Sequence, residues 1–288
     1  MAKMTKEILE KEYSGNAFLT KIDPLILKLV LANREYMKLA FGENVEYERL
    51  FEQILLCPET EEILYEAPEK KPYYERGSRP ILEAAVEEAT KGCVTEREIV
   101  LGLMSYIRDL RKKSHGYDYF YGGTEEELIK KGERYCERVA RLMCGLCEIA
   151  GIPARTIFHV SGGHLTNEIF IEGKWSFIDP RFGVFYIGED GKMMSVVEIM
   201  RNREAIFNQP DWVYAYESDE STTEFKCQQN HDFYFHPREL QLISYYSLAD
   251  KDKYHFEWTP SAAFRMPVRD EAYKEYAKLR QEYFAANK

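Results

Sequence analysis

The fold is decided by two neighbouring stretches of the chain, 132-GERYCERVARLMCGLCEIAGIPAR-155 and 162-GGHLTNEIFIEGKWSFIDPRFG-183. In the first stretch, apolar residues between Val139 and Ala150 recur at helical spacing, and Gly151 followed by Pro153 is a typical helix end. The helix that ends there begins early enough to place Cys136 in its first turn.

After this helix the sequence changes to a strand pattern. A short strand is predicted over 156–160, and a hairpin follows with strands over 165–171 and 174–178. The two strands of the hairpin are separated by Glu172-Gly173, a pair suited to a two-residue turn.

The length of this turn sets which side chains meet. A two-residue turn places Thr166 opposite Asp179, and His164 then lies two residues further along the same face. Diagonal neighbours of this kind are about 7–8 Å apart between backbones, a gap that side chains of this length can close. The hairpin therefore predicts a contact between His164 and Asp179, on condition that the turn has two residues.

These three side chains have complementary chemistry. A thiol reacts as the thiolate, and the first turn of a helix lowers a thiol pKa through its dipole and its free N–H groups. Of the six cysteines, Cys136 alone is so placed. A cysteine nucleophile needs an imidazole within reach, and the imidazole needs a group that holds it. We predict these roles for Cys136, His164 and Asp179 respectively.

The same residues carry a family resemblance. The two stretches resemble the core signature of the transglutaminase-like superfamily, in which a G-x-x-C-type segment opens a helix ending in GIPAR. An H-A-W-N-E strand and a G-K-W…D-P strand follow in that family. The resemblance covers roughly Thr95 to Gly183 and aligns the family's cysteine, histidine and aspartate with Cys136, His164 and Asp179.

The resemblance implies a papain-like thiol enzyme that needs no cofactor and no metal. Its substrate would be an amide, peptide or isopeptide bond in a peptide or protein, cleaved through a thioester on the cysteine. Leu165-Thr166 replaces the family's Ala-Trp, and no tryptophan precedes Cys136 as in cross-linking transglutaminases. These departures favour hydrolysis, as in a peptidase or amidase, over transamidation.

The resemblance also implies an α+β fold with a transglutaminase-like or cysteine-proteinase-like core, in which the nucleophile helix packs on an antiparallel sheet. We expect the core over 93–190, a helical N-terminal extension over 1–92, and an α/β C-terminal extension over 191–288. Further helices are predicted over 23–41, 47–56, from 81, 96–111, from 124, 195–207 and 270–286, and further strands over 232–235, 241–248 and 254–258.

Four residues near the triad are candidates for substrate binding. Tyr117, Tyr119 and Tyr121 lie in HGYDYFYGG, beside glycines, and one of them could supply the hydrogen-bond donor that the missing tryptophan provides elsewhere. Gly163 immediately precedes His164. The alternative for the tyrosines is a loop that packs aromatic rings onto the domain.

Composition restricts the class of protein. The chain has 288 residues, 45% of them hydrophobic, and a formal charge of −10, which disfavours binding to nucleic acid because phosphates require a basic surface. No run of about 18 apolar residues and no secretory signal is found, so neither a membrane span nor export is expected. We expect a cytoplasmic protein with reduced cysteines; its oligomeric state is not predicted.

Two other functions remain open from the sequence. One is a transglutaminase fold retained as a non-catalytic peptide- or protein-binding module, as the altered Leu165-Thr166 segment would allow. The other is zinc or redox use of Cys144 and Cys147, although core packing is favoured because both lie inside the helix. His231 and His236 would point to opposite faces of an apparent strand, which argues against a metal site there.

Overall fold

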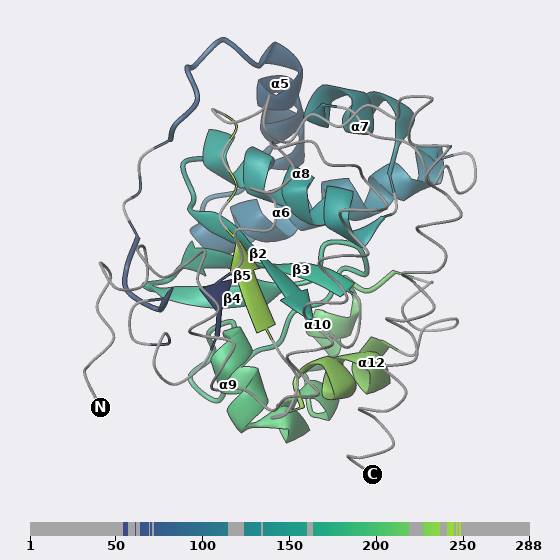
Figure 1. The fold of residues 1–288 in the computed structure, drawn as a ribbon. Helices are drawn as coiled ribbons and strands as arrows, with labels where there is room; N and C mark the ends of the chain where they lie inside the picture. The colour runs from purple at the N-terminus through teal and green to yellow at the C-terminus, as the bar shows by residue number, and fades with distance from the viewer. Residues whose placement is uncertain are drawn as a thin grey trace, which may run out of the picture.

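A computed structural model describes the chain over residues 54–56, 61, 64–68, 70, 72–114, 124–133, 135–159, 164–218, 227–236, 241–244, 246 and 248. The predicted helices over 23–41 and 270–286 and the predicted strand over 254–258 lie outside these residues. In the described part, helices cover both faces of a central sheet (Figure 1). This arrangement confirms the predicted α+β class and the antiparallel sheet.

The sheet has five strands in the order β1-β5-β2-β3-β4, and every neighbouring pair is antiparallel. The strands are β1 (Ile54–Leu55), β2 (Ala154–His159), β3 (His164–Ile171), β4 (Lys174–Ile178) and β5 (Gln241–Ser244). The strand next to the centre, β5, is therefore one of the last described segments of the chain.

The hairpin of β3 and β4 has the predicted two-residue turn. Glu172 and Gly173 both have positive φ, of 54° and 81°, as a type I′ turn requires. Ile171 then pairs with Lys174, and the ladder continues to the last pair, which includes Asn167. The predicted register is confirmed.

One face of the sheet is covered by α5 (Pro80–Ala89), α6 (Glu96–Leu110), α7 (Glu125–Lys131) and α8 (Cys136–Ile149), with a short 3₁₀ helix, η3 (Arg111–Lys113), after α6 (Figure 1). Capping boxes begin α6 at Thr95 and α7 at Thr124, within the helices predicted there. Helix α8 packs on β2 and β3 and against α5 and α6, and its apolar stripe belongs to the larger hydrophobic core.

The other face carries α9 (Val196–Arg201), the 3₁₀ helix η4 (Arg203–Phe207) and α12 (Cys227–Tyr234), with α10 (Asp211–Tyr214) nearby (Figure 1). A second core forms there between Phe177 and Ile243 of the sheet, Ile199 of α9, and Phe235 just after α12. His164, the first residue of β3, and Asp179, the residue after β4, lie at the same end of this antiparallel pair.

Four predicted elements differ from the structure. The strand expected over 232–235 is wrong, because residues 227–234 form helix α12. The helix expected over 47–56 is wrong at Ile54 and Leu55, which pair with β5. The strand predicted over 241–248 ends at Ser244, and the helix expected over 195–207 divides into α9 and η4 at Asn202. Short segments like these take their conformation from tertiary packing rather than from local pattern.

The sheet draws strands from all three predicted regions of the chain, since β1 lies within 1–92 and β5 within 191–288. The bounds at 92 and 190 stay a prediction. Among the described residues, no helix is both long enough and apolar enough to cross a membrane.

Candidate active site

Cys136 is the first residue of α8 and is partly exposed. Its place over the sheet is fixed one turn further on by the buried side chain of Asn167 on β3. The Nδ2 group of Asn167 donates to the carbonyl oxygen of Ala140 at 2.9 Å and to Sγ of Cys144 at 3.2 Å. These bonds hold the N-terminal half of α8 against β3, whose first residue is His164.

His164 and Asp179 meet as the hairpin register predicts. Nε2 of His164 lies 2.6 Å from Oδ2 of Asp179, and both side chains are buried. The imidazole of His164 also forms a hydrogen bond with the thiol of Cys136. The three predicted side chains are thus joined in one series, from thiol to imidazole to carboxylate.

Both carboxylate oxygens of Asp179 accept hydrogen bonds. Its Oδ1 accepts the backbone N–H groups of Arg181 at 3.0 Å and Phe182 at 3.3 Å, in a turn closed by the bond from Gly183 N to the Asp179 carbonyl oxygen at 2.9 Å. Gly183 has φ of 72°, and a Cβ there would collide with the carbonyl oxygen of Tyr216. Only glycine fits this turn without strain.

The electrostatics favour an ion pair between thiol and imidazole. Burial alone would lower the pKa of His164, but the charge and hydrogen bond of Asp179 and the contact with Cys136 raise it to about 9. Burial opposes ionisation of Cys136, yet its bond to His164, the charges of His164 and Arg181, and the N–H of Leu165 lower the thiol pKa. The pKa of Asp179 stays far below its usual range, despite burial, because of the two histidines beside it.

Aromatic rings enclose the His164 imidazole. The rings of Phe182 and Tyr234 lie with centroids 5.6 Å and 5.3 Å from it, and His159 stacks at 6.3 Å. Burial and the neighbouring histidines lower the pKa of His159 well below its usual value. Of the two stacked imidazoles, His164 is therefore the one that carries the positive charge.

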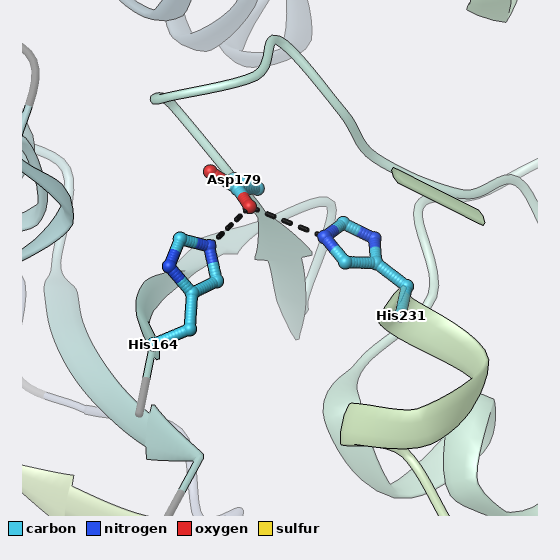
Figure 2. A group of neighbouring side chains, drawn as sticks. All are labelled: His164, Asp179 and His231. Carbon is cyan, nitrogen blue, oxygen red and sulfur yellow. Dashed lines mark hydrogen bonds and ion pairs between the residues drawn. The ribbon is translucent and has the colours of Figure 1, made fainter. Parts of the chain in front are cut away.

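A fourth side chain, which the sequence analysis did not assign to the site, contacts Asp179. His231 of α12 is fully buried, and its Nε2 lies 3.2 Å from the same Oδ2 that His164 contacts (Figure 2). The phenol of Tyr186 lies 2.6 Å from Nδ1 of His231. The i, i+3, i+4 spacing of His231, Tyr234 and Phe235 is the signal that could have identified a helix with this face inward.

The three side chains in Figure 2 are also a donor set that a divalent cation could use. The ligand atoms of His164, Asp179 and His231 all lie within 4.8 Å of one another, and imidazole with carboxylate suits Zn²⁺. In the described arrangement, however, both Nε2 atoms make hydrogen bonds to Asp179. A ring nitrogen cannot donate a proton and bind a metal at once, so this geometry suits hydrogen bonding.

The remaining predicted residues fall into two groups. Cys144 and Cys147 are buried residues of α8, and burial raises the pKa of both thiols. Both properties agree with the predicted packing role. The substrate-binding candidates lie outside the described residues: Tyr117, Tyr119, Tyr121 and Gly163.

Residues 83–180 match the family model of the transglutaminase-like superfamily. The match confirms the predicted resemblance, and it contains Cys136, His164 and Asp179 but not His231 or Tyr186. No curated protein and no solved structure matched the chain.

Proposed function

We propose that this protein is a cysteine-dependent hydrolase of the transglutaminase-like kind, which cleaves an amide, peptide or isopeptide bond through a thioester on Cys136. One observation carries the proposal: the thiol at the start of α8, the His164 imidazole and the Asp179 carboxylate form one hydrogen-bonded series. Superfamily membership of residues 83–180 supports thiol chemistry of this class.

The first half of the reaction forms the thioester. The Cys136 thiolate attacks the carbonyl carbon, and negative charge moves onto the carbonyl oxygen of a tetrahedral intermediate. Free backbone N–H groups at the start of α8 are placed to donate to that oxygen. His164 then gives its proton to the leaving nitrogen, the C–N bond breaks, and the amine departs.

The second half regenerates the Cys136 thiolate beside protonated His164. Neutral His164 takes a proton from water, the resulting hydroxide attacks the thioester carbon, and the C–S bond breaks to release the carboxylic acid. Asp179 keeps one ring nitrogen of His164 protonated and stabilises the imidazolium each time it forms. An amine in place of water would give transamidation.

The first test measures the reactivity of the thiol. Limiting iodoacetamide and peptide mass mapping give the alkylation rate of Cys136 against pH, in the wild type and in His164→Ala. Cys93 is the internal reference, because it is partly exposed and its thiol donates to the carbonyl oxygen of Glu98. We expect Cys136 to react well below the free-thiol pKa of about 8.5, and His164→Ala to slow it.

Equal alkylation of Cys136 and Cys93, unaffected by His164→Ala, would refute the catalytic proposal and favour the binding-module alternative. A second test is a search for the thioester. Intact-mass measurement after mixing with peptide and isopeptide libraries should show an acyl adduct that hydroxylamine removes. The adduct should be missing in Cys136→Ala.

A further inference from the structure

The geometry points to His231 as a positioning residue, which helps Asp179 to hold His164 in the orientation that thiol chemistry requires. The role rests on the proposed function and adds a part to it. His231 comes from α12, outside the segment that matches the family model. The C-terminal part of the chain would then belong to the catalytic machinery, in addition to covering the sheet.

The hydrogen bonds fix the tautomer of His231. Burial and the neighbouring His164 lower the pKa of His231, so the imidazole is neutral and has one donor and one acceptor nitrogen. Ionised Asp179 can only accept, so Nε2 of His231 carries the proton. Nδ1 is then the acceptor, and the Tyr186 hydroxyl donates to it at 2.6 Å.

This assignment fills the acceptor capacity of Asp179. An ionised carboxylate offers about four acceptor positions. Oδ1 accepts two backbone N–H groups, of Arg181 and Phe182, and Oδ2 accepts His164 and His231. Among the described residues, the bond to His164 alone would fix Oδ2 if His231 were absent, so the imidazole would depend on a carboxylate oxygen that it orients itself.

Tyr186 and its surroundings keep His231 in place. The Tyr186 ring stacks on Phe177, with centroids 5.9 Å apart and planes 6° from parallel. The Phe177 and Phe235 rings lie roughly perpendicular to the His231 ring, with centroids 5.5 Å and 6.0 Å from its centroid. An apolar side chain would fill this pocket equally well, so packing alone does not require a histidine. The two hydrogen bonds require one.

A matched pair of variants separates the donor from the packing. His231→Gln keeps an N–H group that can reach Asp179, whereas His231→Leu keeps the volume and loses the donor. The readout is the pH profile of Cys136 alkylation with Cys93 as reference. A hydrogen bond to a charged group contributes enough for about a tenfold change in rate. We therefore expect Leu to slow alkylation at neutral pH about tenfold, and Gln to restore it to within about threefold.

Tyr186→Phe removes the hydroxyl that donates to Nδ1 of His231 and so tests the tautomer. It should slow alkylation of Cys136 by less than His231→Leu does. The ¹⁵N resonances of the His231 ring in the wild type test the same point without a substitution, so a variant that fails to fold does not obscure the result. Protonated Nε2 and unprotonated Nδ1 are expected. The opposite tautomer, or a doubly protonated ring at neutral pH, would overturn the assignment.

The outcomes distinguish the two proposals. If wild-type Cys136 shows a lowered pKa that depends on His164, yet His231→Leu behaves like the wild type, the positioning role is wrong and the proposed function stands. If wild-type Cys136 reacts like Cys93, the proposed function itself fails. Stoichiometric zinc in the purified protein, lost in His231→Leu, would make these side chains metal ligands and would also overturn the positioning role.

Discussion

Replacing Asp179 with asparagine removes one buried negative charge and leaves a side chain of nearly the same shape. Asp179 is fully buried and accepts four N–H groups, among them Nε2 of His164 at 2.6 Å. The carboxylate is the main reason that the pKa of His164 stands at about 9. In Asp179→Asn, the charge that raises this pKa is removed, whereas burial, which lowers it, remains.

The size of the effect follows from the two pKa values. The ordinary pKa of histidine is 6.5, so 9 − 6.5 is a difference of about 2.5, a factor of roughly 300 in proton affinity, or about 3 kcal/mol. The reactive pair needs ionised Cys136 and protonated His164, so it exists above the thiol pKa and below the imidazole pKa. Asp179→Asn lowers the upper limit of this window below neutral pH.

We therefore expect alkylation of Cys136 in Asp179→Asn to fall at neutral pH by at least about tenfold, with the factor of roughly 300 as the upper limit. Its pH profile should move toward that of an ordinary thiol. The matched control is Asp190→Asn, an exposed carboxylate that should change nothing. A rate in Asp179→Asn within threefold of the wild type, with folding unchanged by circular dichroism, would refute the ion-pair explanation.

Three further predictions concern stability, each measured as the free energy of unfolding in urea. Arg155→Met should cost about 3–5 kcal/mol, because Arg155 and Glu168 are fully buried partners at 2.5 Å and the carboxylate would lose its cation; a loss under about 1 kcal/mol would contradict this. Gly183→Ala should cost more than about 2 kcal/mol, from positive φ and the collision with the Tyr216 carbonyl, whereas an unchanged midpoint would mean that the turn can relax. Thr95→Ala should cost about 1 kcal/mol by removing the α6 cap, and a neutral result would show that the cap is dispensable.

The contacts among Cys136, His164 and Asp179 could be predicted because each step depends on local rules. Helical spacing and the Gly151 stop placed Cys136 in the first turn, where the structure has it as the first residue of α8. The two-residue turn set the parity of the hairpin and so brought His164 to Asp179. Both signals act over fewer than about 20 residues, and such patterns are the ones that sequence reasoning reads best.

The second histidine could not be predicted in the same way. His231 is 52 residues from Asp179 along the chain, and its contact with Asp179 depends on how α12 packs in the folded protein. An extended segment would point His231 and His236 to opposite faces, and the observed helix over 227–234 removes that premise. β1 was missed for a similar reason, since a two-residue strand exists only through its pairing with β5.

The position of β5 beside β2 has a consequence for synthesis of the protein on the ribosome. Cys136 emerges 244 − 136 = 108 residues before the end of β5, which at about 5–20 residues per second is a delay of roughly 5–20 s. His231 is made in the same late interval, so the nascent chain carries its thiol well before the sheet and the second imidazole are complete. In chains stalled before residue 227, we expect Cys136 to be alkylated no faster than an ordinary thiol. The thiol would then stay unreactive until translation is nearly finished.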